Sequence, residues 1–442
     1  MELVSIEIRR ELNRIPEAQV VVRDGDVAAR RFKLSNAAFF EPGKRVTIFA
    51  RYEGESEDVV LFEGLVLRHA IESRGRSSSL RVELKDAAFK LTRQRKSAVF
   101  HKQSDDETIR KLLDDAKLTV GDLEPTKTKH DEMVQYYASD WDFILSRADV
   151  QGLVVDVSQG KVSVRPMVPQ DKPKLKLEYG IGPGFELELE IDGADQWAAM
   201  TSAGWDAGKL EPGEPSDAKD PSVKVGNLDP AEVARKLGGD TFTLLYPGTA
   251  GDGELTAWAD ARLARSRLSF LRGRLTVAGR ADLAPLDFVE LAGVGDRFDG
   301  KALISGVTQR IDNDGWTTEL QLGLAPGWFA REPDIADVPA AGLLPPAEGL
   351  QIGVVGDFEK DPKGELRVKV LLSPVDKKQG AVWARMARPD AGNGRGFVHW
   401  PEPGDEVVVG FVSGDPRKAI ILGALHGSKN KPPKAIGDPS KE

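Results

Sequence analysis

The histidines are the residues of this chain that most readily suggest chemistry, but their spacing does not support it. His69, His101, His130, His399 and His426 are scattered along the sequence without an H-x-H or H-E-x-x-H spacing. Those spacings place two imidazoles on one metal ion, so no zinc site of this kind is predicted. The chain has no cysteine, which excludes zinc–thiolate sites, disulfides and cysteine nucleophiles. We therefore expect no metal and no other cofactor.

Acidic side chains lie close together in the sequence at Asp105-Asp106-Glu107, at Asp140 and Asp142, and at Asp405-Glu406. A hydrolase needs two carboxylates held a few ångströms apart with separated pKa values, and adjacency in the sequence does not supply that. Asp140 and Asp142 flank a predicted helix start, where N-capping and the helix dipole account for them. No catalytic residue is predicted.

Two glycine-rich stretches, "AGNGRG" (391–396) and "GIGPG" (180–184), have the composition of phosphate-binding loops. Neither ends in Lys-Ser/Thr, and neither joins a strand to a helix as a dinucleotide-binding loop does. We expect turns or mobile loops at both places.

Composition limits the class of protein. The 442 residues are 40% hydrophobic and 30% charged, which is typical of a folded globular chain. The formal net charge of −9 disfavours a broad nucleic-acid surface. The N-terminus "MELVSIEIRRELNRIPEAQV" lacks the apolar core of a signal peptide, and no apolar run reaches membrane-spanning length.

The elements that must position any site are mostly strands. Residues 1–95 alternate apolar and polar residues at period two, with turn signals between the runs. Helices are predicted over 104–118, with Ser104 and Glu107 as a capping box, over 139–152 and over 254–269. Residues 205–253 carry little pattern and are expected to form an extended connection.

The segment 350–427 contains five short predicted strands, which fit a small closed barrel of the oligomer-binding type. The five are Leu350–Val355, Leu366–Leu372, Ala381–Met386, Glu406–Phe411 and Ala419–Leu425. Such barrels often bind nucleic acid on aromatic residues in a basic groove. Between Gly349 and Gly427 the segment contains eleven Lys and Arg residues and ten Asp and Glu residues, so it carries almost no net charge. A structural role is therefore favoured over nucleic-acid binding.

An internal repeat is the most informative pattern. "PGKRVTIFARYEGESEDVVLFEGLVLRHAIESRGRSSSLRVELKDA" and "PLDFVELAGVGDRFDGKALISGVTQRIDNDGWTTELQLGL" follow the same order of strands and turns. Phe62-Glu63-Gly64 matches Phe298-Asp299-Gly300 in this alignment. We interpret the repeat as two similar β-barrels with helices between them. Three such chains would present six nearly equivalent units, which suits a six-fold partner.

Several residues are expected to be structural. The predicted turn positions are Pro42, Gly43, Gly64, Gly300, Pro401, Gly404, Asp405 and Gly414. The expected core aromatics are Phe62, Trp141, Phe143, Phe298 and Trp316.

Five stretches in order resemble the VgrG and phage hub-and-spike family of contractile injection systems, most closely the extracellular phage-tail-like particles. They are "FFEPGKRVTIFARY…LFEGLVLRH", "YYASDWDFILSRADVQGLVV", "LTAWADARLARSRLSFLRGRLTVAG", "FDGKALISGVTQRIDNDGWTTELQLGL" and "GRGFVHWPEPGDEVVVGFVSGDPRKAIILGALHGSKNKPP". The resemblance implies a mainly β protein with some α structure, in which two tube-like barrels with helical insertions precede an oligomer-binding-fold barrel.

The resemblance also implies a domain plan. It assigns 1–103 to a first hub barrel, 104–204 to an insertion, 205–332 to the connection, helix and second hub barrel, 333–349 to a linker, 350–427 to the oligomer-binding fold and 428–442 to a tail leading toward a needle. Family members usually carry an extra N-terminal strand and continue into β-helix repeats, so this chain looks shortened and holds no needle of its own.

The function implied is a non-catalytic homotrimeric spike hub that adapts the six-fold inner tube to a three-fold spike for membrane puncture and cargo delivery. The implied partners are the inner tube protein, baseplate proteins, a spike-tip protein, cargo effectors and the target membrane, with no nucleic acid. The chain is expected to be made in the cytoplasm and assembled into an injection particle. Two alternatives stay open at this point: a spike-borne cell-wall hydrolase, and a nucleic-acid-binding module built on the oligomer-binding fold.

Overall fold

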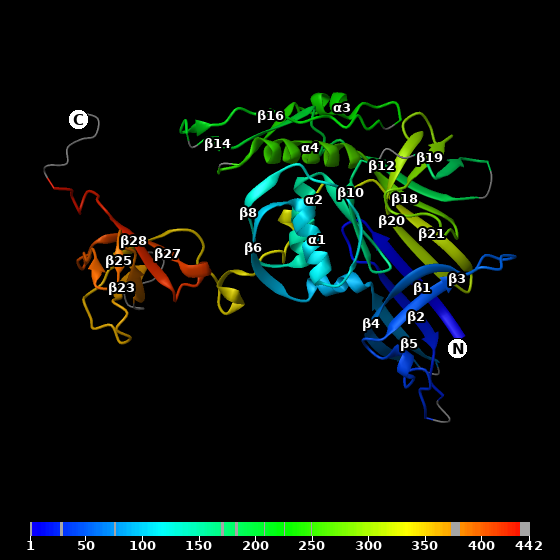
Figure 1. Ribbon diagram of the computed structural model, residues 1–442, viewed down its shortest axis with the longest axis horizontal. Coiled ribbons are helices and arrows are strands. Elements are labelled where there is room, and N and C mark those ends of the chain that lie inside the picture. The colour runs from blue at the N-terminus through cyan, green and yellow to red at the C-terminus, as the bar shows by residue number, and fades with distance from the viewer. Residues whose placement is uncertain are drawn as a thin grey trace. The chain divides into compact units, whose positions relative to one another are not determined.

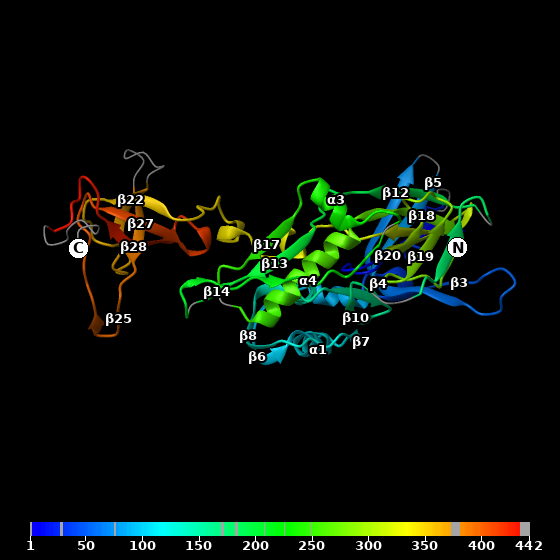
Figure 2. The ribbon, with the colours of Figure 1, turned by 90° about the horizontal axis from the view of Figure 1, so that it is seen from above.

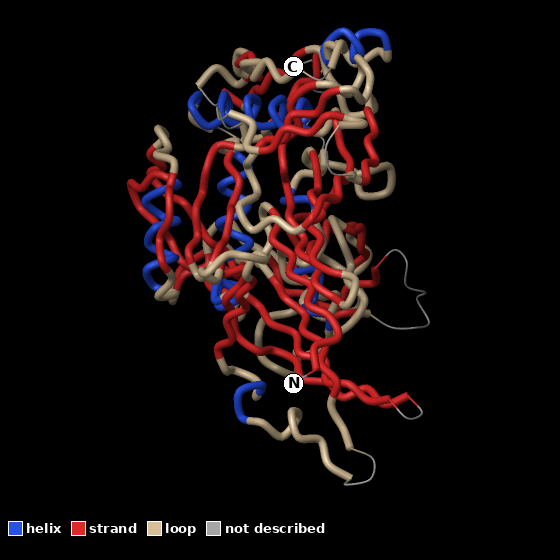
Figure 3. The backbone as a smooth tube through the Cα atoms, turned by 90° about the vertical axis from the view of Figure 1, so that its right-hand side faces the viewer, coloured by secondary structure: helices blue, strands red, loops and turns tan. Residues whose placement is uncertain are grey.

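Strands dominate both of the compact units into which the chain divides, Met1–Ile335 and Ala336–Glu442 (Figure 1, Figure 3). The computed structural model describes residues 2–26, 30–74, 77–168, 172–181, 184–206, 208–224, 226–248, 250–372 and 381–433. The α-helices of this described part are α1 Asp105–Asp115, α2 Asp140–Val150, α3 Pro230–Lys236 and α4 Asp252–Leu268. Short 3-10 turns lie at Ala38–Phe40, Ala87–Thr92, Phe329–Arg331, Pro339–Gly342 and Val412–Gly414. None of the described helices combines the length and apolarity needed to cross a bilayer.

One eleven-stranded sheet organises the first unit, and the N-terminal strands form its first half. These strands are β1 Glu2–Glu11, β2 Glu17–Arg23, β3 Arg45–Ala50, β4 Val59–Arg74 and β5 Ser77–Lys85. They pair in the order β1-β2-β5-β4-β3. The long strand β4 changes partner along its length, because its first residues pair with β3 and its later residues pair with β5.

The second half of the sheet repeats this plan. Its strands are β11 Leu175–Glu178, β12 Glu186–Ile191, β18 Leu271–Ala278, β19 Phe288–Ala292, β20 Gly300–Asp312 and β21 Gly315–Leu322. They pair in the order β12-β18-β21-β20, with β19 on the first residues of β20 and β11 on β19. β1 pairs antiparallel with β20, so the two expected hub units are two halves of one continuous sheet.

The pairing pattern supports the internal repeat but shifts its alignment. β3-β4-β5 corresponds to β19-β20-β21, and both long strands carry a bulge, between Val66 and Arg68 in β4 and between Ile304 and Gly306 in β20. Aligning the two bulges makes Ile304 equivalent to Val66. The sequence alignment of the two Phe-x-Gly motifs differs from this structural alignment by two residues. A shift of two residues keeps every side chain on the same face, which is why the sequence pattern survives it.

Each half of the sheet buries alternate residues in a core of its own. Ile8, Val20 and Val82 lie in the first core, and Leu275, Val307 and Leu320 in the second. Removing such a side chain from water contributes about 1.5–3 kcal/mol. Tyr52, in the turn after β3, connects the halves: its ring stacks on Trp316 at 5.1 Å, and its hydroxyl accepts the Ala281 N–H at 2.7 Å.

A helical insertion follows the first half. It contains the two-stranded ribbon of β6 Arg95–Ser104 and β8 Lys129–Ser139 and the sheet of β7 Thr119–Leu123, β9 Leu153–Ser158 and β10 Lys161–Pro166. α1 and α2 lie beside them (Figure 1). α1 begins where the capping box was predicted, since Glu107 Oε2 accepts the Ser104 N–H at 2.9 Å. Trp141 and Phe143 of α2 are buried in this core, as expected.

The segment 205–253 is more regular than the predicted extended connection. It holds β14 Trp205–Asp206, β15 Glu211–Pro212, β16 Ser216–Asp217, α3 and β17 Thr241–Leu245, and β17 pairs in parallel with β13 Ala199–Ala203. Asp229 caps α3, and Pro230 occupies its first turn. The short strands carry too few residues to show a period. β16 and β17 are fixed by pairing with β13, which packs on α4 (Figure 2), whereas β14 and β15 pair with each other.

The second unit contains a closed barrel in the order β22-β23-β24-β28-β27. The strands are β22 Gln351–Val355, β23 Val368–Leu372, β24 Val382–Met386, β27 Glu406–Phe411 and β28 Ala419–Leu425, and β25 Ala391–Gly392 pairs with β26 Arg395–Gly396 beside them. All five barrel strands were predicted within two residues at each end. Val355, Val370, Val407 and Ile421 fill the barrel.

Candidate functional site: the polar face of the sheet and the barrel surface

The face of the eleven-stranded sheet opposite the two cores is an organised polar surface of the first unit. Strand pairing places charged residues from most of its strands on this one face, because alternate residues of each strand point away from the core. They are Glu186, Glu188, Glu190, Arg272, Arg274, Glu319, Arg310, Glu7, Arg9, Glu11, Glu17, Lys85, Glu83, Arg68, Glu63 and Arg45.

Opposite charges face one another across neighbouring strands at the centre of this face. Arg310 of β20 reaches Glu319 of β21 at 3.1 Å and Glu7 of β1 at 3.3 Å. Glu17 of β2 lies 3.9 Å from Arg9 and 3.5 Å from Lys85. Exposed pairs of this kind contribute about 0–1 kcal/mol each, so they fix register and neutralise charge more than they stabilise the fold.

The pattern continues toward both ends of the sheet. Arg68 reaches Glu83 at 3.3 Å, Arg45 reaches Glu63 at 2.7 Å, and Arg272 reaches Glu190 at 3.2 Å. The final strand β12 is different, since Glu186 and Glu188 make no ion pair within the described part of the chain. The polar face is therefore self-neutralised in its middle and acidic at the β12 edge.

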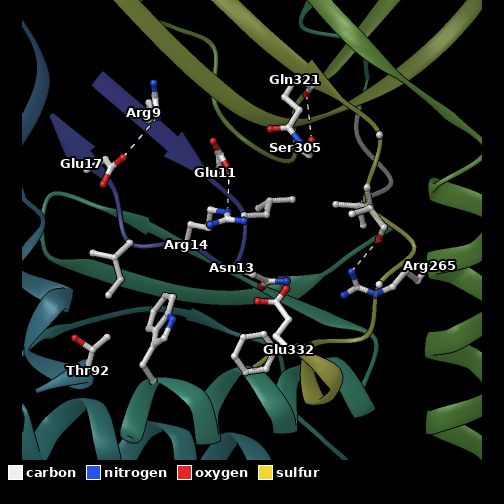
Figure 4. A pocket seen from close by; sticks show the side chains of 18 of the residues that line it. Arg9, Glu11, Asn13, Arg14, Glu17, Thr92, Arg265, Ser305, Gln321 and Glu332 are labelled. Carbon is white, nitrogen blue, oxygen red and sulfur yellow. Dashed lines mark hydrogen bonds and ion pairs between the residues drawn. The ribbon is translucent and has the colours of Figure 1, made fainter. Parts of the chain in front are cut away.

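A cavity of about 680 Å³ opens at the end of β1 on this face (Figure 4). The turn after β1, the strand ends near Ser305 and Gln321, and the chain that leads to Glu332 line it. Arg14 is paired with Glu11 at 3.1 Å, and Arg265 donates to the Ala325 carbonyl at 3.4 Å. The lining offers paired charges and amides, and no nucleophile stands beside a general base among the residues described there.

Buried ion pairs fasten the helical insertion to α4. Arg147 of α2 donates through Nε to Asp105 at 2.7 Å and through Nη2 to Glu254 of α4 at 2.8 Å, and Gln151 donates to Asp105 at 2.7 Å. Burial alone lowers the pKa of Arg147, but the two carboxylates outweigh it and raise that pKa above its ordinary value. The guanidinium stays charged, and three elements share one hydrogen-bonded centre.

A second buried arginine holds α4 from its other end. Arg267, with 1% of its side chain exposed, donates to Asp220 through Nε at 3.0 Å and Nη2 at 2.8 Å, and to the Trp197 carbonyl at 2.8 Å. These contacts join α4 to the segment after β12. Nearby, Arg265 pairs with buried Asp149, which also accepts the Phe329 N–H at 2.9 Å.

The loop after β2 is organised by one carboxylate. Asp24 accepts the N–H groups of Leu34 at 3.0 Å and Ser35 at 2.6 Å. Partial burial raises the pKa of Asp24, but these backbone donors and those of Gly25 and Lys33 together lower it below its ordinary value. The loop is therefore tied to the ionised form of Asp24.

The structure places five of the expected turn residues in turns or at their ends. Pro42 and Gly43 form the turn before β3, where Gly43 has φ +92° and donates to Val66 at 2.8 Å. Gly404, with φ +95°, and Asp405 precede β27, and the Gly404 N–H donates to Val355 at 2.8 Å. Gly414, with φ +71°, ends the short turn after β27.

The other expected turn positions differ. Gly64 lies within β4, where it pairs with Val46 of β3, and not in a turn. A side chain is disfavoured there because a Cβ would come within 2.5 Å of the Lys85 carbonyl oxygen. Gly300 is the first residue of β20, with φ +131°, at the junction of turn and strand. Pro401 is buried just before the Gly404 turn. Phe62 is buried as expected, while Phe298 and Trp316 are only half-buried.

The candidate chemical residues do not assemble into a site. Among the described residues, no group of three His, Asp or Glu could hold a metal ion. His69 contacts Ser35 and the Phe40 carbonyl, and His130 contacts Asp105. The cap of α2 is Ser139, not Asp140 or Asp142, since its hydroxyl accepts the Asp142 N–H at 3.1 Å. The acidic β12 edge was missed, although the alternation "ELELEI" signals an amphipathic strand.

The outer surface of the barrel carries an apolar stripe on Leu350 and on β22 and β28, the two strands that flank β27. Leu350, Ile352, Val354, Leu422 and Leu425 are exposed, Leu350 by 66% and Leu422 by 51%. Leu350 and Leu422 both lie beside Gly410 of the intervening strand β27, within 3.7 Å of where a Cβ of that residue would stand. Single exposed apolar residues are ordinary, but a group of them is typical of an interaction surface.

The basic and aromatic face of the same barrel is already occupied by its own acidic loop. Asp361 accepts from Arg367 at 2.6 Å, and Glu359 accepts from Lys369 at 2.5 Å. Both cations also lie 5.5 Å from the ring centre of Trp383. Hydrogen bonds from Arg367 hold the pKa of Asp361 far below its ordinary value. A nucleic-acid strand would have to displace this loop before it could stack there.

Comparison with known proteins shows which families match the chain. A profile described as the Alg8 N-terminal domain matches residues 1–313, and one described as the type VI secretion system/phage-baseplate injector OB domain matches residues 351–426. Over 56 residues, 13% of this chain, the sequence is 39% identical to the actin cross-linking toxin VgrG1 of Vibrio cholerae serotype O1. The chain spans only 5% of the length of that curated relative.

Two solved tail proteins share the fold at low sequence identity. The 43 kDa tail protein of prophage MuSo2 from Shewanella oneidensis has a TM-score of 0.52 at 15% identity, covering 73% of this chain and 93% of that one. A tail protein from Neisseria meningitidis MC58 has a TM-score of 0.51 at 15% identity, covering 76% of this chain and 95% of that one.

Proposed function

The chain belongs to the VgrG and phage hub-and-spike family of contractile injection systems, through the Alg8 N-terminal domain and the injector OB domain, and we propose that it acts as a homotrimeric hub. In this role it joins the six-fold inner tube to a three-fold spike and tip, for membrane puncture and delivery of cargo. Its function then lies in shape and symmetry.

The observation that carries this proposal is the duplicated half-sheet. β3-β4-β5 and β19-β20-β21 pair in the same order and carry equivalent bulges. A trimer of such chains presents six similar units, which can face six identical tube subunits through near-equivalent contacts. The buried ion pairs of Arg147 and Arg267 support the role. They hold the helical insertion, α4 and the segment after β12 together, so few elements of the first unit can move independently under mechanical load.

The apolar stripe of the barrel supports self-association. Leu350, Ile352, Val354, Leu422 and Leu425 would remain in water in a monomer. Contact between three barrels would bury such a surface, and permanent interfaces are more apolar than ordinary protein surface. Through the proposed hub, the partners would be the inner tube protein, baseplate proteins, a tip protein with its cargo and the target membrane.

The two alternative functions have less support. In the oligomer-binding barrel, the two cations beside Trp383, Arg367 and Lys369, are paired with carboxylates of its own loop. A hydrolase would need a second carboxylate beside a first in an open site, and Asp105 and Asp140 are instead buried against Arg147 and Lys96.

Native mass spectrometry of the purified chain at micromolar concentration tests the trimer. We expect a mass three times that of one chain. Leu422→Glu should lower the trimer fraction, because it places a charge in the apolar contact, whereas Phe358→Glu, at another exposed position of the same unit, should not. A strictly monomeric wild type would overturn the proposal, and a trimer without six equivalent units in a low-resolution reconstruction would overturn the tube-docking part of it.

A further inference from the structure

The chain that leaves the first compact unit stays attached to it as far as its last residues. After β21, the Leu324 N–H donates to the Leu268 carbonyl of α4 at 3.0 Å, and the Phe329 N–H donates to Asp149 of α2 at 2.9 Å. Both donors are backbone groups, so these hydrogen bonds fix the path of the main chain itself. The first unit ends a few residues later, at Ile335.

Arg95 of β6 holds the two residues that end this unit. Its Nη2 donates to the Asp334 carbonyl at 2.8 Å and to the Asp334 carboxylate at 3.1 Å, and its Nη1 donates to the Ile335 carbonyl at 3.0 Å. The Arg95 side chain is only 22% exposed. A guanidinium is a rigid fork of N–H donors, so a single arginine can hold two consecutive carbonyls. Among the described residues, these hydrogen bonds are the last that tie the chain to the first unit.

The chain packs onto the second unit from Pro339 onward. Its 3-10 turn contacts the short turn Val412–Gly414 that follows β27, and Ala340 in it is only 5% exposed. A Cβ on Gly414 would stand 3.3 Å from Pro339, and the Gly414 carbonyl accepts the Ala347 N–H at 2.8 Å. Most of the segment that was expected to be a linker is therefore packed on the unit that contains the barrel.

Three residues lie between these two anchors. Ala336, Asp337 and Val338 are exposed. Within the described part of the chain their hydrogen bonds stay local: the Val338 N–H donates to Asp337, and the Val338 carbonyl accepts the Ala341 N–H. Three residues extend over at most about 11 Å. The whole segment 333–349 would reach about 50 Å as a free Pro-rich linker, so anchoring at both ends removes most of its reach.

We propose that the joint between the two units is a hinge confined to residues 336–338, with Arg95 as the anchor on one side and the Gly414 turn on the other. Pro339 restricts the residue before it to extended backbone, and Val338 has φ −67° and ψ 144°, so most of the freedom belongs to the two residues before Val338. A hinge of a few residues changes the orientation of the parts that it joins but leaves little slack between them. Such a joint passes a push from one unit to the other, which suits a mechanical role and does not depend on the trimer.

Limited proteolysis of the full chain with elastase tests the length of the hinge. A protease binds an extended stretch of several residues, so three exposed residues between two anchors should be cut slowly. Inserting Gly-Gly-Ser-Gly-Gly-Ser between Ala336 and Asp337 touches neither anchor and should make cutting at the joint about tenfold faster, with the products identified by mass. A wild type that is cut at the joint as fast as the insertion variant would overturn the short hinge.

Arg95→Met tests the first anchor. The joint of this variant should be cut about tenfold faster than in wild type, because the hydrogen bonds to Asp334 and Ile335 are lost together and cleavage follows the population of the opened chain. Arg51→Met is the matched control, since Arg51 pairs with exposed Asp58 at 2.8 Å, and its joint should be cut as slowly as in wild type. Equal cutting of the two variants would overturn the anchor. New cuts spread through the first unit would also overturn it, because Arg95 would then hold the fold and not the connection.

Two neighbouring alanines test the second anchor. Ala340 is 5% exposed whereas Ala341 is exposed, and both have positive φ, +55° and +51°. Ala340→Glu places a charge in the buried contact and should release the turn and speed cutting, whereas Ala341→Glu should leave the joint protected. Equal cutting of the two variants would overturn this anchor. Native mass reports the trimer separately, so failure of the hinge and failure of the proposed function give different results.

Discussion

Removing Asp220 should destabilise the first unit more than removing its partner Arg267. The Arg267 side chain is 1% exposed and Asp220 is 42% exposed, so the two ends of this ion pair differ in access to water. In Asp220→Asn the guanidinium stays buried and loses its carboxylate, keeping only neutral oxygens such as the Trp197 carbonyl at 2.8 Å. In Arg267→Met the carboxylate can turn to water, and the cost is the carbonyl that loses its donor.

The magnitudes follow from these environments. Stranding a buried charge costs about 3–5 kcal/mol, and the partial exposure of Asp220 lowers this to about 3 kcal/mol. Arg267→Met should cost about 2 kcal/mol for a buried acceptor left unsatisfied. The double variant should also cost about 2 kcal/mol, again for the carbonyl left without a donor. It adds no further cost, because without Arg267 there is no buried guanidinium that could lose its carboxylate. For a unit of the size of Met1–Ile335, 3 kcal/mol lowers the melting temperature by about 4 °C.

Chemical denaturation of the three variants, followed by tryptophan fluorescence, measures this thermodynamic cycle. Arg45→Met is the control, because the Arg45–Glu63 pair is exposed and should contribute within about 0.5 kcal/mol. If Asp220→Asn costs less than Arg267→Met, or if the two single costs add in the double variant, the reasoning from unequal burial is wrong.

Two further predictions concern a carboxylate and a glycine. Folding lowers the pKa of Asp24 below its ordinary value, so its stabilisation is fully present above the unfolded pKa near 3.8 and is lost as the pH falls through the lower folded pKa. The melting temperatures of wild type and Asp24→Asn should therefore differ at about pH 7 and converge as the pH falls through that lower folded pKa. A constant difference across that range would count against this assignment. Gly273→Ala should cost about 1–3 kcal/mol in denaturation, since its Cβ would come within 2.1 Å of the Glu188 carbonyl oxygen, whereas Gly327→Ala meets nothing within 4 Å; equal stability of the two variants would contradict the contact.

Local patterns in the sequence were sufficient for much of the fold. The barrel strands Glu406–Phe411 and Ala419–Leu425 were predicted with their observed bounds, because a period of two and a Gly-Asp-Pro turn act within a few residues. α1 was predicted from its capping box for the same reason. The segment 205–253 was predicted incorrectly, because its strands are short and because β16 and β17 form by pairing with β13, which lies outside the segment.

The sequence by itself determined which residues alternate toward a core, that a β unit occurs twice, and that the chain lacks cysteine and metal-binding spacing. Only the tertiary structure decided that the two units share one sheet through β1 and β20, that their true alignment is shifted by two residues, and that Arg147 and Arg267 are buried with their carboxylates. The physical reason is one of range. Period and turn chemistry are local, whereas strand register and ion pairing depend on which distant segments the fold brings into contact.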